Sequence, residues 1–134
     1  MLEEEENRLG ALKFIDERKI DLIQDINTQE DLNFFIELLD IYIKDLPLSI
    51  ARIKNSVTAQ DKNQVRFYAH KLKGSSLTFG IKYISEICVK LEDAVKEDIT
   101  SQTTASFVEE LVAKFELIIK ELETLKEKYA HMSF

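Results

Sequence analysis

Residues that interrupt helices are scarce in this chain. Its 134 residues include three glycines and one proline, far fewer than a β-sandwich with many tight turns would need. There is no tryptophan, and the single cysteine, Cys88, excludes an internal disulfide and indicates a reducing compartment. The length and the 45% of hydrophobic residues suit one domain with a core of its own. These absences favour long helices.

Long apolar runs are also missing. The richest stretch, residues 34–43, is interrupted by Glu37 and Asp40 and is too short to cross a bilayer. The chain begins with an acidic run, unlike the basic start of a signal peptide, so we expect a cytoplasmic protein without membrane contacts. The net charge of −7 argues against nucleic-acid binding, because phosphate backbones would be repelled.

Apolar residues recur at three- and four-residue steps over four segments, as one face of a helix requires. The segments are residues 28–57, 62–79, 81–97 and 101–129. Pro47 is expected to kink or split the first, whose apolar positions continue through Leu48 to Val57. The signals for helix ends are a capping box at Thr28 and Asp31, caps at Asp61 and at Thr100 or Ser101, and a terminating Gly80.

The N-terminal part predicts shorter elements. The acidic cluster in residues 1–15 favours a short helical appendage, and Asp16 would cap a second short helix through about Ile26. No strand-like alternation or internal repeat is visible. The predicted fold is therefore all-α: an antiparallel up-down four-helix bundle over residues 16–130, with one or two short additional N-terminal helices.

One segment of this acidic chain contains no acid. Between Lys62 and Ser85 there is one histidine, His70, and there are five cations, which are Lys62, Arg66, Lys71, Lys73 and Lys82. Because the chain is acidic overall, such an island suits a local acidic or phosphorylated partner.

His70 should face away from the core of its helix. At 100° per residue it lies about 150° from the mean direction of the expected core positions, which are Val65, Ala69, Leu72, Ser76 and Phe79. Its neighbours on the outer stripe are Arg66, Lys73, Gly74 and Leu77.

These neighbours fit a histidine that carries phosphate. Gly74 removes a side chain one turn from the imidazole, although glycine costs about 1 kcal/mol relative to alanine within a helix. Lys73 and Arg66 could neutralise a phosphoryl group, and a histidine is mostly neutral at pH 7, as a nucleophile must be. Phe67 and Leu77 look exposed and suit a docking surface.

Other site residues have supporting roles or none. Ser75 and Ser76 are expected to donate hydrogen bonds to carbonyls of the preceding turn. His131 is interpreted as a solvent-exposed residue or a helix-terminal cation, and Cys88 as a small hydrophobic residue on an apolar stripe. Surface histidines and glycines at helix contacts are common, but here a histidine, cations and a glycine coincide on one stripe.

At these residues the sequence resembles the histidine-containing phosphotransfer (HPt) domain family. In the family motif a histidine is followed, after one variable residue, by Leu-Lys-Gly-Ser, with a glycine ten positions beyond it. The matching residues are His70, Leu72, Lys73, Gly74, Ser75, Ser76 and Gly80. The likeness extends over roughly residues 16–127, with Ala69, Cys88, Leu91 and Glu92 fitting common patterns.

The resemblance implies a four-helix bundle in which His70 accepts phosphate on Nε2 from a receiver-domain aspartate and passes it to another receiver. Lys73 would lie beside the phosphate, supported by Arg66 and Lys71, and Gly74 would permit access. Partners would be response-regulator receivers and a hybrid sensor histidine kinase. The domain itself would be a monomer without cofactor or metal, and the receiver would supply Mg²⁺. Some members have a glutamine where this chain has Glu92, whose carboxylate would accept from Nδ1–H and fix the ring tautomer.

Three alternatives remain at this point. The chain could be the phosphorylated domain of a chemotaxis-type histidine kinase, whose motif Phe79 and Gly80 resemble. It could be the dimerisation helix pair of a sensor kinase, although there an acid usually follows the histidine and here Lys71 does. It could also be an adaptor bundle that binds receivers without phosphotransfer.

Overall fold

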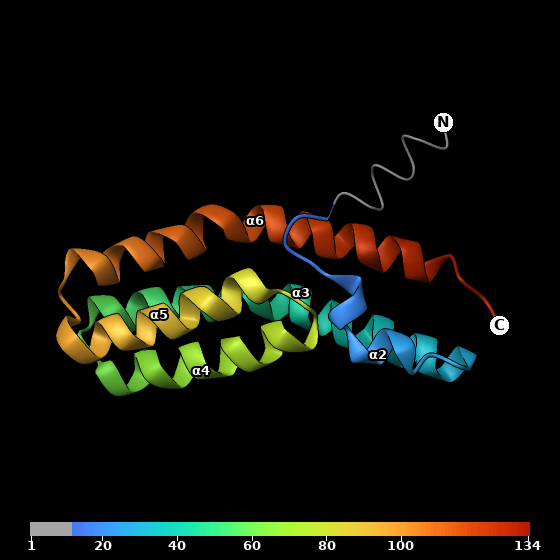
Figure 1. Cartoon of the computed structure of the whole chain (residues 1–134), viewed down its shortest axis with the longest axis horizontal. Coiled ribbons are helices and arrows are strands. Elements are labelled where there is room, and N and C mark those ends of the chain that lie inside the picture. Colours follow the sequence, from blue (N-terminus) through green and yellow to red (C-terminus); the bar gives the residue numbers. More distant parts are fainter. Residues whose placement is uncertain (1–11) are drawn as a thin grey trace.

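The structure is a computed structural model, and it describes residues 12–134. Its elements are the 3-10 helix η1 (Glu17–Lys19) and the α-helices α2 (Asp21–Gln24), α3 (Gln29–Thr58), α4 (Lys62–Thr78), α5 (Lys82–Asp98) and α6 (Gln102–Ala130). The four long helices form the predicted bundle, because α3 and α5 each pack against both α4 and α6 (Figure 1).

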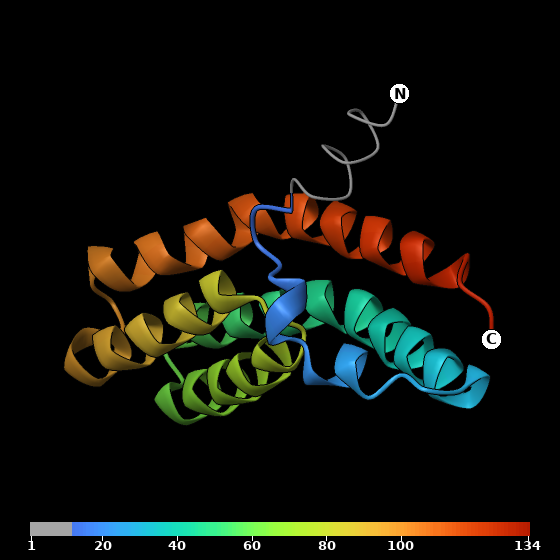
Figure 2. The ribbon, with the colours of Figure 1, turned by 45° about the vertical axis from the view of Figure 1, so that its right-hand side comes forward.

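Two of the four helices are much longer than the others. α3 and α6 have 30 and 29 residues, whereas α4 and α5 have 17 each. At a rise of about 1.5 Å per residue, the long pair extends well beyond the short pair. At this end of the bundle η1 and α2 take the place of α4 and α5 beside α3 (Figures 1 and 2).

The helix starts follow the expected capping. Thr28 and Asp31 form the predicted capping box, in which each side chain accepts from the backbone of the other. Asp61 accepts from the backbone of Gln64 and begins α4. Ser101, rather than Thr100, caps α6.

Pro47 does not split α3, which runs unbroken through it. A proline within a helix leaves one carbonyl of the preceding turn without its usual donor, at a cost of about 3 kcal/mol. Leu46 and Ile50 beside it are buried in the core, so packing on both sides holds the two halves together. Of the two expected effects, a kink or a split, the split does not occur, and Figure 2 shows α3 as one curved helix.

The single short helix expected from Asp16 to about Ile26 is also wrong. The segment forms η1 and α2, separated by Ile20, whose backbone is extended and whose side chain is fully buried. Burial of Ile20 fixes a backbone conformation that a continuous helix would not allow. Most of the helix expected over residues 1–15 lies outside the described residues. Residues 12–15 are not helical, and Ile15 is part of the core.

This N-terminal segment ties two parts of the bundle together. The backbone N–H of Asp16 donates to the carbonyl of Gly80, 3.2 Å away, in the turn between α4 and α5. Glu17 accepts from Lys128 on α6 at 2.9 Å. The segment therefore joins the end of the helix that carries His70 to the far side of the molecule.

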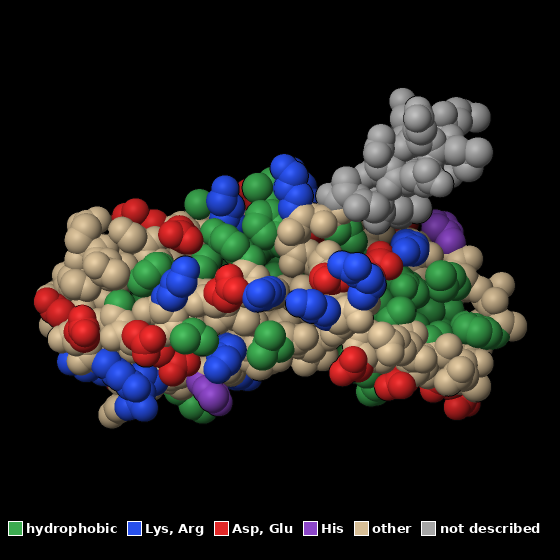
Figure 3. Space-filling model, in the orientation of Figure 1, with side chains coloured by type: hydrophobic (Ala, Val, Ile, Leu, Met, Phe, Trp, Pro, Cys, Tyr) green, Lys and Arg blue, Asp and Glu red, His purple; other side chains and the backbone are tan. Residues whose placement is uncertain are grey.

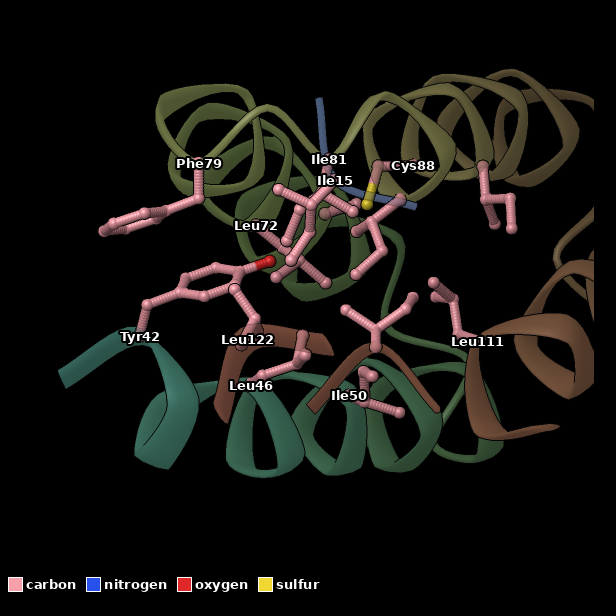
Figure 4. Packing of buried hydrophobic residues seen from close by; sticks show 14 of the residues in the cluster. Ile15, Tyr42, Leu46, Ile50, Leu72, Phe79, Ile81, Cys88, Leu111 and Leu122 are labelled. Atoms are coloured by element: carbon pink, nitrogen blue, oxygen red, sulfur yellow. The ribbon is translucent and has the colours of Figure 1, made fainter. Parts of the chain in front are cut away.

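The core combines apolar packing with one buried hydrogen bond. Side chains from all four long helices meet in it (Figure 4), and the hydroxyls of Tyr42 on α3 and Ser76 on α4 lie 2.7 Å apart. Cys88 is completely buried, and this burial, with a smaller contribution from the charge of Glu92, raises the pKa of its thiol to about 12. The thiol therefore stays protonated, as a small hydrophobic residue would require.

One apolar position of the pattern is not in the core. Leu48 is 55% exposed on α3, although Ile50 and Ile53 nearby are buried. In the part of the chain that the structure describes, no helix is both long and apolar enough to cross a membrane.

Gly80 ends α4 as the sequence predicts. Its φ is +67°, its N–H donates to the carbonyl of Leu77, and the next N–H donates to the carbonyl of Ser76. This is the Schellman arrangement, in which glycine adopts the left-handed conformation without steric cost. A Cβ at this position would lie 2.6 Å from the carbonyl oxygen of Asp16, so the close approach of the N-terminal segment requires a glycine as well.

We expect Gly80→Ala to lower the free energy of unfolding by about 1–3 kcal/mol, because it adds backbone strain and displaces Asp16. The measurement is urea unfolding followed by circular dichroism. Gly74→Ala, on the same helix, is the matched control. An unchanged midpoint for Gly80→Ala would contradict this account of the turn.

Candidate functional site

His70 lies on the exposed side of α4. Val65, Ala69 and Leu72 are buried on the opposite side of the helix, so packing of these three residues sets the direction of the imidazole. Figure 3 shows a histidine at the surface over α4, with basic, acidic and hydrophobic side chains around it. The outward direction predicted from helix periodicity is confirmed.

The imidazole lines an open depression of about 540 Å³ between α4 and α5. Most of its lining comes from α4, and α5 contributes Glu92. The lining residues are Asn63, Arg66, Phe67, His70, Lys71 and Glu92. Five of them are among the predicted site residues, brought together from two helices. Asn63 was missed, although its position seven residues before His70 places it on the same stripe of the helix.

The depression has mixed charge. Arg66 and Lys71 are exposed beside His70, and Glu92 is half-buried on the facing helix. Among residues 12–134, the structure shows no hydrogen bond or ion pair between Glu92 and His70. Glu92 is thus near the ring without being bonded to it.

Lys73 lies at the edge of the site rather than in the depression. Its side chain is half-buried, and its positive charge lowers the pKa of the Cys88 thiol, against the larger effects of burial and of Glu92. Lys73 on α4 and Glu92 on α5, the helix of Cys88, therefore change the pKa of this thiol in opposite directions. The ammonium group has a flexible stem of four carbons, and it can move toward a phosphate without any change in the backbone.

Gly74 is open to solvent. Apart from the nearby backbone of its own helix, a Cβ built at this position would meet no atom within 4 Å. Close packing between helices, a common reason for glycine within a helix, is therefore excluded here. Because glycine has no side chain, nothing projects from the helix at this position beside the imidazole of His70.

The two serines of the motif differ. Ser75 donates to the carbonyls of Lys71 and Leu72 at 3.3 and 3.2 Å, as predicted. Ser76 does not bond to the preceding turn; it is buried and pairs with Tyr42 across the helix interface. The expectation for Ser76 is wrong because its hydroxyl points to the core side of α4, where the phenol hydroxyl of Tyr42 lies 2.7 Å away.

α5 also fixes the helix turn that follows His70. The hydroxyl of Ser85 donates to the carbonyl of Lys73 at 3.2 Å, which is a side-chain bond between α5 and α4. Ser85 and Glu92 therefore face α4, and Val89, four residues after Ser85, lies between them on the same side. Val89 is partly exposed, so it adds apolar surface near the depression.

Two larger apolar side chains lie on the outer surface of α4. Phe67 is 63% exposed and lines the depression, and its ring packs against Tyr68 at 5.3 Å. Leu77 is 51% exposed, two turns after His70, and does not line the depression. Both positions are exposed as predicted. Within residues 12–134, histidine, cysteine and acidic side chains form no group of three that could hold a metal ion.

Comparison with known proteins is consistent with this geometry. Residues 37–128 match the family model described as the Hpt domain. The chain belongs to the Hpt domain family. The match begins within α3, so η1, α2 and the first part of α3 lie outside it.

A relative among characterised proteins is the phosphorelay intermediate protein rdeA of Dictyostelium discoideum, with 29% identity over 102 residues. The alignment covers 76% of this chain and 40% of the length of that protein.

Two solved structures share the fold. Histidine-containing phosphotransfer protein B (HptB) of Pseudomonas aeruginosa PAO1 has 21% identity and a TM-score of 0.74, covering 87% of this chain and 97% of that one. The HPT domain of a sensor hybrid histidine kinase from Shewanella has 20% identity and a TM-score of 0.50, covering 91% and 92%. At these identities the likeness concerns the fold, and it confirms the predicted helical bundle.

We expect Gly74→Ala to raise the free energy of unfolding by about 0.5–1 kcal/mol, because the position is helical, exposed and unobstructed. Urea unfolding is the measurement. A loss of stability would mean that glycine is needed at this position for the fold, and would remove the argument that it is kept for access.

Proposed function

We propose that His70 accepts a phosphoryl group from the aspartyl phosphate of one receiver domain and transfers it to the aspartate of another. The observation that carries this proposal is an exposed imidazole in a depression with basic residues, next to a helix position without a side chain. The known relative named as a phosphorelay intermediate supports the same role. The cytoplasmic location expected from the sequence is part of the proposal.

The chemistry is a displacement at phosphorus. The lone pair of Nε2 forms a bond to phosphorus while the bond between phosphorus and the aspartyl oxygen breaks, and its electrons return to the receiver carboxylate. The second receiver reverses these steps with its own aspartate. Since little covalent work is asked of the protein, positioning and charge neutralisation account for most of the rate.

Each residue near His70 has a part in this scheme. Arg66, Lys71 and Lys73 would offset the charge of the phosphoryl group, with Lys73 moving from the edge of the site. Glu92 would accept the hydrogen of Nδ1, which leaves Nε2 free to attack. Its side chain lines the same depression as His70, and the proposal requires a change of rotamer that brings the carboxylate to the ring.

The partner would contribute the rest. A receiver domain would bring Mg²⁺ and the acidic pocket around its aspartate, and the basic side chains of the depression would face that pocket. Phe67 and Leu77 would give apolar contact on the surface of α4. A hybrid sensor histidine kinase is the expected source of the first receiver.

We expect His70→Gln to abolish phosphate uptake from a panel of phosphorylated receivers, because the amide cannot act as the nucleophile. The label on the wild-type chain should be lost in acid and kept in base, as for phosphohistidine. The helical circular dichroism spectrum should not change, since His70 is exposed.

His131→Gln is the matched control for this experiment, because it removes the other histidine of the chain, also exposed, at the end of α6. Label that persists in His70→Gln would reject His70 as the acceptor. A chain that binds receivers and never takes up label would be an adaptor.

We expect Gly74→Gln to slow phosphotransfer at least about tenfold, equal to about 1.4 kcal/mol in the barrier, because its side chain would fill the open space where a partner approaches. Stability should not fall. The measurement is the transfer rate per folded molecule in rapid-quench experiments.

Ala51→Gln is the control for Gly74→Gln, since Ala51 is exposed on α3 and does not line the depression. A wild-type phosphotransfer rate for Gly74→Gln would show that the partner does not need a position without a side chain here.

A further inference from the structure

A second exposed apolar surface lies on α3, away from the depression that contains His70. Phe34, Ile41 and Leu48 are 54%, 57% and 55% exposed, and no residue of α3 lines the depression. We call these three residues the α3 stripe. Their spacing of seven residues is nearly two helical turns, so successive members point within about 20° of each other over roughly 21 Å of helix.

Single exposed apolar residues are common on soluble proteins, but a row along one helix face is not. α6 gives the contrast. Val112 and Leu117 are also exposed, but they are five residues apart and therefore point in directions about 140° apart. A seven-residue repeat of apolar side chains is the pattern by which one helix packs along another.

The charges beside the α3 stripe of one copy are complementary to those of a second copy. Glu37 and Lys44 lie along the same edge of the stripe, one on each side of Ile41, and both are exposed. If a second α3 lies antiparallel with Ile41 at the centre, Phe34 faces Leu48 of the other copy, and Glu37 comes beside Lys44 of the other copy. In a parallel arrangement the same edges of the two helices would lie on opposite sides of the contact, and Glu37 would not come beside Lys44 of the other copy. The charge pattern therefore favours the antiparallel arrangement.

Existing contacts of Lys44 do not prevent this. Its ammonium group is 2.9 Å from Asp40 in the same helix, and the lysine side chain is 76% exposed. An exposed ion pair of this kind contributes little to stability, so Lys44 can exchange or share its partner.

We propose that the α3 stripe binds a second copy of this chain through a two-fold antiparallel contact between the two α3 helices. Such a contact is isologous, since the same patch is used by both copies. His70 stays open in each copy, because the depression lies between α4 and α5. The proposal does not depend on phosphotransfer, and it differs from the monomer expected from the sequence.

The contact is weak and reversible. One helix face with three apolar residues per copy is smaller than a standard interface of about 1,600 Å². Dimers therefore form at high protein concentration and dissociate on dilution.

The first test is sedimentation of the whole chain at protein concentrations from about 1 µM to about 1 mM. The expected result is a rise from the monomer to the dimer mass for the wild type, and monomer throughout for Ile41→Lys. Leu117→Lys is the matched control, since it places the same charge at an exposed apolar site on α6, and it should dimerise like the wild type. Monomer throughout for the wild type, or a dimer that survives Ile41→Lys, would overturn the proposal.

The second test uses the charges. Glu37→Lys and Lys44→Glu should each remain monomeric alone, because each places like charges across the contact. An equimolar mixture should form heterodimers, because both cross-pairs then have opposite signs. Absence of association in the mixture, with both variants folded by circular dichroism, would exclude the antiparallel pairing.

Phosphate uptake separates this proposal from the proposed function. Ile41→Lys should accept phosphate from a receiver at the wild-type rate while it stays monomeric. If the variant instead loses receiver binding and the wild type is monomeric, the stripe contacts a receiver and the self-association proposal fails.

Discussion

The rotation of α4 about its own axis determines which side chains the partner meets. Val65, Ala69 and Leu72 are fully buried, and the bond between Tyr42 and Ser76 holds the same side of the helix against α3. A buried hydroxyl that loses its hydrogen-bond partner costs about 1–3 kcal/mol. The pair therefore opposes any rotation or shift of α4 against α3, in addition to its contribution to packing. Because a rotation of α4 by nearly half a turn about its axis would bury His70, the outward imidazole is a consequence of the core on the other side.

The end of α4 is fixed by a different set of contacts. Gly80 lets the chain turn sharply and leaves room for the Asp16 carbonyl, while Ile15 and Ile20 are buried on either side of that contact. The two glycines thus have opposite surroundings. At Gly80 another backbone lies too close for a side chain, whereas at Gly74 the space beside the helix is empty. Composition alone cannot separate these two cases, but the free space around each position does.

The bundle and the direction of His70 could be predicted from the sequence because both depend on helical periodicity, a local property. The N-terminal segment could not. Its extended link at Ile20 depends on a pocket formed by residues about sixty positions later, and no local pattern contains that information. Ser76 is similar, since its partner Tyr42 lies on another helix. Glu92 could be placed near His70 only through the family resemblance, and the depression between α4 and α5 shows that the two are neighbours without a bond.

α3 shows a further limit of periodicity. Its apolar residues follow two directions, one through Phe35, Leu39, Tyr42 and Leu46 and the other through Phe34, Ile41 and Leu48. The pattern alone does not say which belongs to the core, because both repeat at helical spacing. Packing decides: α4 and α6 together cover the first direction, and the second remains outside because two neighbouring helices cannot surround a third. The face that remains uncovered is therefore set by the number of helices in the bundle, and a helix with apolar residues in both directions retains the capacity for one more contact.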